Sequence, residues 1–151
     1  MLKRLMLIVN PMAGRGAYKT NFGEAMQTLC RGGYAVTLFF TARRGDSTRF
    51  AAEYAADYDV VACVGGDGTL SEVLAGLMQL DNPPPVGYFP MGTANDVATT
   101  LGLPKNDTVA SARRIVNGSP HPFDVGAFGE KDYFAYIAAF GACTEVSYAT
   151  P

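Results

Sequence analysis

The sequence lacks the residues that several common kinds of site require. It has one histidine, His121, and three widely separated cysteines, Cys30, Cys63 and Cys143. A structural zinc centre needs about four Cys or His ligands close together, so this class of site is excluded. An odd number of distant cysteines also argues against a disulfide framework. We therefore expect reduced, mostly packing cysteines in a cytoplasmic protein.

Long apolar runs are missing as well. No stretch of about 18 apolar residues occurs, which excludes an ordinary membrane-spanning helix. The short apolar run at residues 5–9 ends at Asn10-Pro11 without a small-residue cleavage site. We interpret it as a first strand rather than as a signal peptide. A chain of 151 residues is long enough for one domain with a hydrophobic core.

The charge distribution is uneven although the net charge is only −2. Residues 1–50 contain eight Lys or Arg and two Asp or Glu, so most of the acidic residues lie later in the chain. A basic first third could meet phosphates and an acidic remainder could hold a cation, but solvated surface charge explains the same asymmetry. The whole chain is too acidic to indicate a nucleic-acid-binding protein.

Strand-like and helix-like segments alternate along the chain. Apolar runs predict strands at residues 5–9, 35–40, 60–64 and 86–89, and two further helices are expected at 94–101 and 107–116. Apolar residues at helical spacing predict the helices between these strands: Tyr18, Phe22, Met26 and Leu29; then Phe50, Tyr54 and Tyr58; then Leu70, Val73, Leu74 and Leu77. This alternation predicts an α/β fold, with a parallel sheet between two layers of helices.

The end of the chain has a different pattern. Two apolar segments, 123–128 and 133–142, are separated by the turn-like residues 129–132 and predict a terminal β-hairpin. Long apolar strands at a terminus normally pair with something. We therefore expect this chain to be the first part of a larger protein or to assemble with partners.

The segment Gly65-Gly66-Asp67-Gly68-Thr69 follows a predicted buried strand and opens a helix. Glycines let the backbone approach a polyphosphate, and a helix start offers unpaired N–H groups to it. Asp67 would hold a metal ion or orient a hydroxyl. Thr69 and Glu72 share a helical face, which leaves Glu72 for a ribose, base or backbone contact. The segment is neither a Walker A loop nor a complete dinucleotide fingerprint, and close packing of strand on helix is the alternative explanation.

Two more loops follow predicted strands. The loop that begins Asn10-Pro11 and includes Gly14 would turn tightly near an anion, with Arg15 within reach of a phosphate, although a plain strand-to-helix turn explains it too. In the loop after residue 90, Thr93 and Asn95 either contact a ligand or cap the next helix. Because ligands of parallel sheets bind beyond the carboxyl ends of the strands, we expect these loops, Thr41 and the glycine-rich turn at one edge.

Two carboxylates could have either structural or functional roles. Asp96 lies in the first turn of a predicted helix, where a carboxylate also favours the helix dipole. Asp124 interrupts the apolar run 123–128, and a carboxylate within a strand is costly to bury without a partner. That partner would be a cation, a basic side chain or open solvent.

Taken in this order, the segments resemble the diacylglycerol kinase catalytic domain, within the superfamily that includes NAD kinases and 6-phosphofructokinases. The residues that carry the resemblance are Asn10-Pro11-x-x-Gly14, Thr41, Gly65-Gly66-Asp67-Gly68-Thr69 with Glu72, Pro90-x-Gly92-Thr93-Ala94-Asn95-Asp96, and Asp124-x-Gly126. The resemblance implies a fold like the N-terminal domain of 6-phosphofructokinase and NAD kinase. It also implies transfer of the ATP γ-phosphate to a lipid hydroxyl, such as that of diacylglycerol, with Mg²⁺.

The resemblance further implies roles for individual residues. The nucleotide contacts would come from Asn10, Pro11, Gly14, Thr41, Gly65, Gly66, Asp67, Gly68, Thr69, Glu72, Thr93 and Asn95. Catalytic roles would fall to Asp67, Asp96 and Asp124. Since carboxylates repel phosphates directly, they would act through Mg²⁺, whose individual ligands stay unassigned.

Family members of the bacterial type are much longer and carry a β-rich second domain, which is expected to supply the catalytic base. We therefore predict that this chain is the nucleotide-binding lobe, weakly active or inactive alone. Unpaired hairpin strands would favour a homodimer, and a lipid substrate would favour peripheral membrane contact. The alternatives are a kinase of NAD or of a sphingoid base, and a non-catalytic nucleotide-binding module. An NAD kinase would carry Asn-Glu where this chain has Asn95-Asp96.

Overall fold

A parallel four-stranded sheet forms the centre of the molecule, in a computed structural model that describes residues 1–128 and 132–134. Its strands are β1 (Lys3–Val9), β2 (Tyr34–Phe40), β3 (Val60–Gly65) and β4 (Val86–Pro90). They lie in the order β2-β1-β3-β4, and every neighbouring pair is parallel. The predicted parallel α/β sheet is therefore confirmed.

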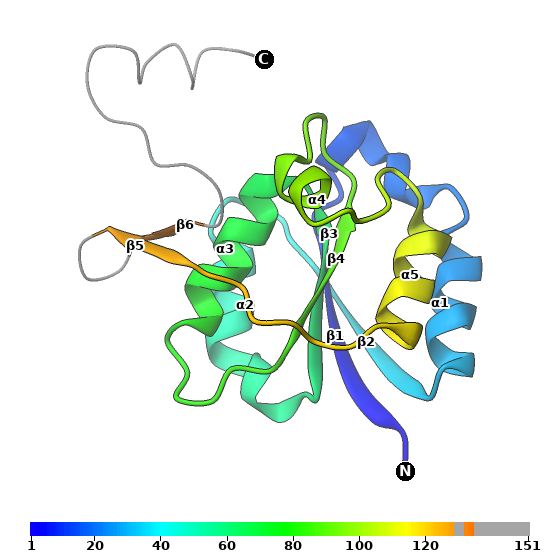
Figure 1. Ribbon diagram of the computed structural model, residues 1–151, viewed down its shortest axis with the longest axis horizontal. Helices are drawn as coiled ribbons and strands as arrows, with labels where there is room; N and C mark the ends of the chain where they lie inside the picture. The colour runs from blue at the N-terminus through cyan, green and yellow to red at the C-terminus, as the bar shows by residue number, and fades with distance from the viewer. Residues whose placement is uncertain (129–131, 135–151) are drawn as a thin grey trace.

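Helices cover both faces of this sheet (Figure 1). Helices α1 (Phe22–Arg31) and α5 (Thr108–Asn117) pack together on one face, and α2 (Asp46–Tyr54) and α3 (Asp67–Leu77) pack together on the other. The short helix α4 (Asp96–Thr100) follows β4. All the strands end on the same side, so the loops that follow them meet at one edge of the sheet.

The core is divided by the sheet into two clusters. Along β1, Leu5, Leu7 and Val9 face the cluster under α1 and α5, whereas Met6 and Ile8 face the cluster under α2 and α3. All five side chains are fully buried. A continuous apolar strand is expected where both faces of a sheet are covered, and each such side chain stabilises the fold by about 1.5–3 kcal/mol.

The cysteines that the structure describes differ in their surroundings. Cys63 is fully buried in the cluster under α2 and α3, and burial raises the pKa of its thiol. Cys30 is exposed near the end of α1. Both are free thiols. Cys63 therefore has the packing role that the sequence predicted, whereas Cys30 does not, and Cys143 lies outside the described residues.

The first helix begins later than its apolar spacing predicted. Tyr18 lies in a 3₁₀ segment, η1 (Ala13–Lys19), rather than in α1. Within η1, Gly14, Arg15 and Gly16 have φ values of 54°, 54° and 84°, which a right-handed helix cannot contain. Tyr18 is nevertheless buried and packs edge-on against Phe22, with ring centroids 5.4 Å apart.

Two other helix boundaries also differ from prediction. Tyr58 follows α2 and the 3₁₀ turn η2 (Ala55–Asp57), yet its ring lies 6.3 Å from that of Phe39 and joins the same core. Helix α4 begins at Asp96 rather than at residue 94, because Asn95 has a φ of 55° and a left-handed conformation.

The chain leaves the sheet after α5 and forms a short hairpin. Strands β5 (Gly126–Phe128) and β6 (Asp132–Phe134) pair antiparallel, as predicted for this segment, and the rest of the expected second strand lies outside the described residues. Residues 119–125 cross the β4 edge of the sheet toward α3 instead of forming a strand (Figure 1). Pro120 and Pro122 lack the N–H groups that strand pairing needs.

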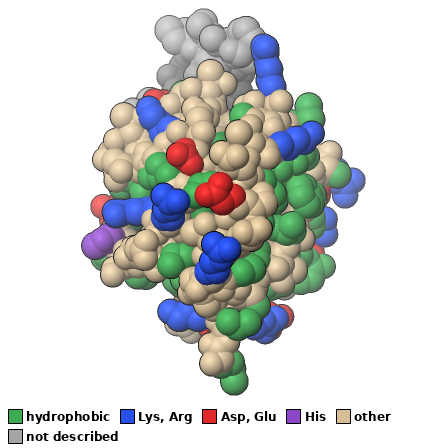
Figure 2. Space-filling model, turned by 90° about the vertical axis from the view of Figure 1, so that its right-hand side faces the viewer, with side chains coloured by type: hydrophobic (Ala, Val, Ile, Leu, Met, Phe, Trp, Pro, Cys, Tyr) green, Lys and Arg blue, Asp and Glu red, His purple; other side chains and the backbone are tan. Residues whose placement is uncertain are grey.

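The surface formed by α1 and α5 carries charges of both signs. Figure 2 shows basic side chains spread around two acidic groups near the centre of this face, with hydrophobic side chains between them. The basic residues on this side are thus dispersed rather than gathered into one stripe. Of the helices in the described ranges, none is both long and apolar enough to cross a membrane.

Candidate functional site

The loops after the four parallel strands meet at one edge of the sheet, as the sequence predicted. Backbone hydrogen bonds join the loops: Asn10 N donates to Val64 O (2.9 Å), Thr41 N to Val9 O (2.9 Å) and Met91 N to Gly65 O (2.8 Å). A cavity of about 1120 Å³ opens beside these loops. Because each loop is tied to a neighbouring strand, the cavity has a backbone frame.

The lining of this cavity includes most of the residues that the resemblance assigned to the nucleotide. Of that set, Asn10, Gly14, Thr41, Gly66, Gly68, Thr69, Glu72 and Thr93 line it. Pro11, Gly65, Asp67 and Asn95 do not, nor do Asp96 and Asp124, for which catalytic roles were predicted. Residues that the sequence did not single out also line it, among them Arg43, Arg44, Ser47, Thr48 and Tyr133.

The glycine-rich turn opens α3 onto the cavity. Gly66 is extended and precedes the helix, and the first helical hydrogen bond runs from Leu70 N to Gly66 O. The amides of the three residues before Leu70 donate to no group within residues 1–128 and 132–134. They are the unpaired N–H groups of a helix start, which attract anions.

The glycines of this turn serve different purposes. A Cβ on Gly65 would collide with Thr69, so this glycine allows the strand to pack on the helix. A Cβ on Gly92 would lie 2.6 Å from the Cα of Gly66, so these two backbones touch. A Cβ on Gly68 would meet nothing within 4 Å. Packing thus explains Gly65, Gly66 and Gly92, whereas Gly68 faces open space at the cavity.

Asn10 connects the first loop to α3. Its side-chain oxygen accepts a hydrogen bond from Met12 N (3.0 Å), which turns the chain, and its side-chain nitrogen donates to the hydroxyl oxygen of Thr69 (3.1 Å). Gly14 completes the loop with a φ of 54° and lies against the carbonyl of Met91, where a side chain would collide. Asn10 and Gly14 therefore set the shape of the cavity wall.

Asp67 points toward α4 rather than into the cavity. Its carboxylate accepts hydrogen bonds from Asp96 N (2.9 Å) and Val97 N (3.2 Å), the first amides of α4. The Tyr88 hydroxyl lies 3.5 Å away, the long limit of a hydrogen bond. Burial, with Cys63 and Asp67 nearby, raises the pKa of Tyr88, which keeps its hydroxyl a donor. Asp67 thus joins the two glycine-containing loops.

The polar residues of the Gly92–Asp96 stretch differ in burial: one is buried within the loop, and the others are exposed. Asn95 is almost fully buried, and its amide group pairs with both N and O of Gly92, at 2.9 and 2.8 Å. Thr93 is exposed and lines the cavity. Asp96 is exposed, and its carboxylate has no hydrogen-bond partner within the described ranges. Asn95 therefore shapes the loop, and Thr93 presents its hydroxyl to the cavity.

Asp124 lies in the chain segment that crosses the β4 edge. It is exposed and precedes β5, so the expectation that it lies within a strand is wrong. The proposed cost of burying it does not arise, since water surrounds the carboxylate. Within the part of the chain that the structure describes, no group of three or more His, Cys, Asp or Glu could hold a metal ion.

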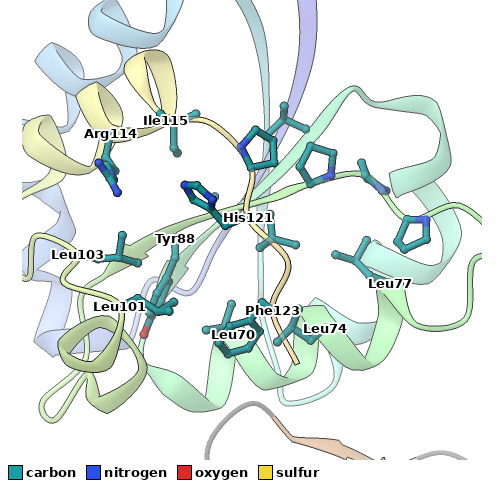
Figure 3. A pocket seen from close by; sticks show the side chains of 18 of the residues that line it. Leu70, Leu74, Leu77, Tyr88, Leu101, Leu103, Arg114, Ile115, His121 and Phe123 are labelled. Carbon is teal, nitrogen blue, oxygen red and sulfur yellow. The ribbon is translucent and has the colours of Figure 1, made fainter. Parts of the chain in front are cut away.

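A second hollow of about 710 Å³ lies on the other side of α3, beside β4 (Figure 3). Its wall is mostly apolar, with Leu70, Leu74 and Leu77 from α3 facing Leu101 and Leu103. The other labelled side chains at its border are Tyr88, Arg114, Ile115, His121 and Phe123. We call it the apolar groove. Sequence periodicity identified Leu70, Leu74 and Leu77 as core residues but gave no sign that they border a hollow.

Known proteins resemble this chain in both sequence and structure. The model of the diacylglycerol kinase catalytic domain matches residues 4–128. The diacylglycerol kinase of Bacillus subtilis (strain 168) is 38% identical over 151 residues, which are 99% of this chain and 50% of that protein. The diacylglycerol kinase of Staphylococcus epidermidis (strain ATCC 12228 / FDA PCI 1200) is 39% identical over 153 residues, 100% of this chain and 48% of that protein.

A solved structure has the same fold. The crystal structure of a diacylglycerol kinase from Bacillus anthracis str. Sterne superposes with a TM-score of 0.77 and 33% identity, and covers 87% of this chain and 45% of that one. This chain therefore spans about half the length of the curated relatives it matches. The family match, the sequence relatives and the shared fold lead to one conclusion: the chain belongs to the diacylglycerol kinase catalytic domain family.

Proposed function

We propose that this chain binds ATP in the cavity at the carboxyl edge of the sheet, as the nucleotide-binding part of a lipid kinase. The observation that carries the proposal is the first turn of α3, whose unpaired amides and open Gly68 adjoin a large cavity. Relatives named diacylglycerol kinase support a diacylglycerol-like acceptor. Asn10, Thr41 and Thr93 would supply the polar contacts that orient the nucleotide.

Magnesium is part of this proposal, although the described residues do not by themselves form a site for it. Mg²⁺ is usually held by one or two carboxylates together with substrate phosphates, so a protein cluster of three ligands is not needed. Both carboxylate oxygens of Asp67 accept amides of α4, and neither Asp67 nor Asp96 lines the cavity, so the described residues assign no ligand to the ion. When bound, the ion neutralises phosphate charge.

The proposed reaction moves the γ-phosphoryl group of ATP to a lipid hydroxyl. The hydroxyl oxygen bonds to the γ-phosphorus, the bond to the β-phosphate oxygen breaks, ADP leaves, and the hydroxyl proton goes to a base. This chain would contribute positioning and stabilisation of phosphate charge. Catalytic roles for Asp67, Asp96 and Asp124 remain predictions. Since the chain spans about half of its relatives' length, we propose weak or no turnover by this chain alone.

A lipid acceptor has consequences for where the protein works. We propose a cytoplasmic protein that contacts the membrane surface peripherally when it meets its substrate. The β5–β6 hairpin is the proposed surface for a homodimer, since a two-stranded hairpin is only marginally stable without further pairing.

Substitution of Gly68 tests the nucleotide site. Gly68→Ala adds a methyl group where the protein leaves open space, so we expect unchanged or slightly raised thermal stability. The same methyl group should hinder a phosphate, and we expect ATP binding about tenfold weaker by calorimetry. Gly23→Ala is the matched control: Gly23 is also the second residue of its helix and also faces open space, but it lies outside the cavity.

Thermal-shift titration with ATP–Mg²⁺, ADP, NAD and NADP compares the candidate functions. A ligand that binds the native state raises the melting temperature by mass action. Stabilisation by ATP and ADP, lost in Gly68→Ala, would support the proposal. Selective stabilisation by NAD would favour an NAD kinase-like protein instead. No stabilisation by any of the four would rule out nucleotide binding by this chain.

A further inference from the structure

Residues 41–45, which connect β2 to α2, bring positive charge to the cavity. Arg43 and Arg44 line it, and no other Lys or Arg of the described residues does. Among the residues that the structure describes, Glu72 is the only one in the lining with a carboxylate. The cavity wall therefore has an excess of positive charge at this loop.

Two carboxylates fix the backbone of this loop. Asp46 is almost fully buried and accepts hydrogen bonds from Ala42 N (2.9 Å) and Arg43 N (3.1 Å). Glu72, on α3, accepts Gly45 N with both carboxylate oxygens at 3.2 Å. The Thr48 hydroxyl also donates to Glu72 O (2.9 Å). The loop is thereby attached to its own helix and to α3.

The arginines near this loop differ in their partners. Arg43 lies 3.6 Å from the Asp46 carboxylate, and Arg49 lies 3.3 Å from the same group. Arg44 makes no ion pair with any residue in the described ranges, and its side chain is exposed. Arg44 is therefore the cavity's one arginine whose charge no described carboxylate balances.

We propose that Arg44 binds the phosphate groups of the nucleotide, an inference that rests on the proposed ATP site. Its neighbour Gly45 contacts Glu72, so the loop meets α3 about one helical turn beyond Gly68. A guanidinium with fixed, forked donors suits phosphate oxygens. Glu72 is then a positioning residue for the loop rather than a ribose contact.

The test compares Arg44→Ala with the wild-type chain by calorimetry, using three ligands: ATP, adenosine and inorganic tripolyphosphate. Loss of a charged hydrogen bond should lower the affinity for ATP and for tripolyphosphate about tenfold. The affinity for adenosine should stay within about twofold of the wild-type value. Arg44→Lys keeps the charge and should lose less. Arg49→Ala is the control, because Arg49 is also an exposed arginine near this loop but does not line the cavity. Melting temperatures verify that each variant is folded.

The possible outcomes distinguish a failure of the Arg44 inference from a failure of the proposed ATP site. Equal affinity of wild type and Arg44→Ala for ATP overturns the role of Arg44 and leaves the ATP site standing. If Arg44→Ala lowers the affinity for adenosine as much as that for ATP, Arg44 contacts the nucleoside, and the inference is also overturned. A wild-type chain that binds neither ATP nor tripolyphosphate overturns both proposals. A loss confined to the two phosphate ligands supports both.

Discussion

Helix α3 separates two hollows of opposite chemistry. On one side it presents Ser71, Glu72 and Ala75 to the polar cavity, and on the other it presents Leu70, Leu74 and Leu77 to the apolar groove. The apolar side is continuous with the core, whereas the polar side holds a loop in place through Glu72. Substitutions on the two sides should therefore change different properties, stability on one and ligand binding on the other.

The largest effect is expected on the apolar side. Leu74→Ala removes a buried side chain that belongs to the core cluster and borders the groove. We expect the free energy of unfolding to fall by about 3 kcal/mol, measured by urea denaturation. Affinity for ATP, measured well below the melting temperature, should stay within about twofold of wild type. A folded Leu74→Ala that binds ATP tenfold more weakly would contradict the separation.

Asp67 opens α3 but lines neither hollow, and its loss should lower the stability of the protein. Asp67→Ala removes the acceptor for the first amides of α4 and leaves the Tyr88 hydroxyl without its partner. We expect a loss of about 2 kcal/mol in unfolding free energy. Asp96→Ala is the control, since its exposed carboxylate has no described partner, and its effect should stay within about 0.5 kcal/mol. Equal losses in the two variants would argue against the capping role.

On the polar side, Glu72→Gln should change stability less than binding. The amide of Gln keeps one acceptor for Gly45 N but loses the charge. We therefore expect the free energy of unfolding to fall by less than about 1 kcal/mol. Because the 41–45 loop is less firmly held, ATP affinity should fall about threefold by calorimetry. Glu53→Gln, in an exposed pair with Arg49, is the control and should change neither quantity.

The smallest effect is one of pH. Hydrogen bonds from Ala42 N, Arg43 N and Arg49, together with the Arg49 charge, lower the pKa of Asp46 below 3.8 despite the burial that opposes this. A lowered folded-state pKa stabilises the protein above the ordinary value and loses that effect as the pH falls through the folded value. The stability difference between wild type and Asp46→Asn should be full at neutral pH and shrink below 3.8. A difference that is constant across this range would show that charge is not involved.

The sequence correctly predicted that the loops after the parallel strands meet at one edge of the sheet. Apolar runs showed where the strands end, and the rule for parallel sheets brought Asn10, Thr41, Gly66 and Thr93 to one edge. The structure confirms this placement. The orientation of the Asp67 side chain was not predicted. It is set by hydrogen bonds from the amides of Asp96 and Val97, which lie far along the chain. No spacing rule reports such a contact.

Two other features escaped prediction for physical reasons. Tyr18 has helical spacing from Phe22, but the left-handed residues before it prevent an α-helix, and only Gly14 and Gly16 hinted at this. Arg44 belonged to the basic first third, which was equally consistent with solvated charge. Its position just after Thr41 was the available signal, and it needed the sheet-edge rule to be noticed.

The contact between Gly66 and Gly92 bears on how this site tolerates mutation. A side chain at Gly92 would have to displace the backbone of Gly66, and a Cβ on Gly66 would lie only 3.3 Å from the Cα of Gly92, although the two are 26 positions apart in sequence. In a saturation library we expect both positions to accept only glycine unless compensating changes occur together. New specificity would then arise most readily in the 41–45 loop, where side chains project from a backbone that two carboxylates already hold.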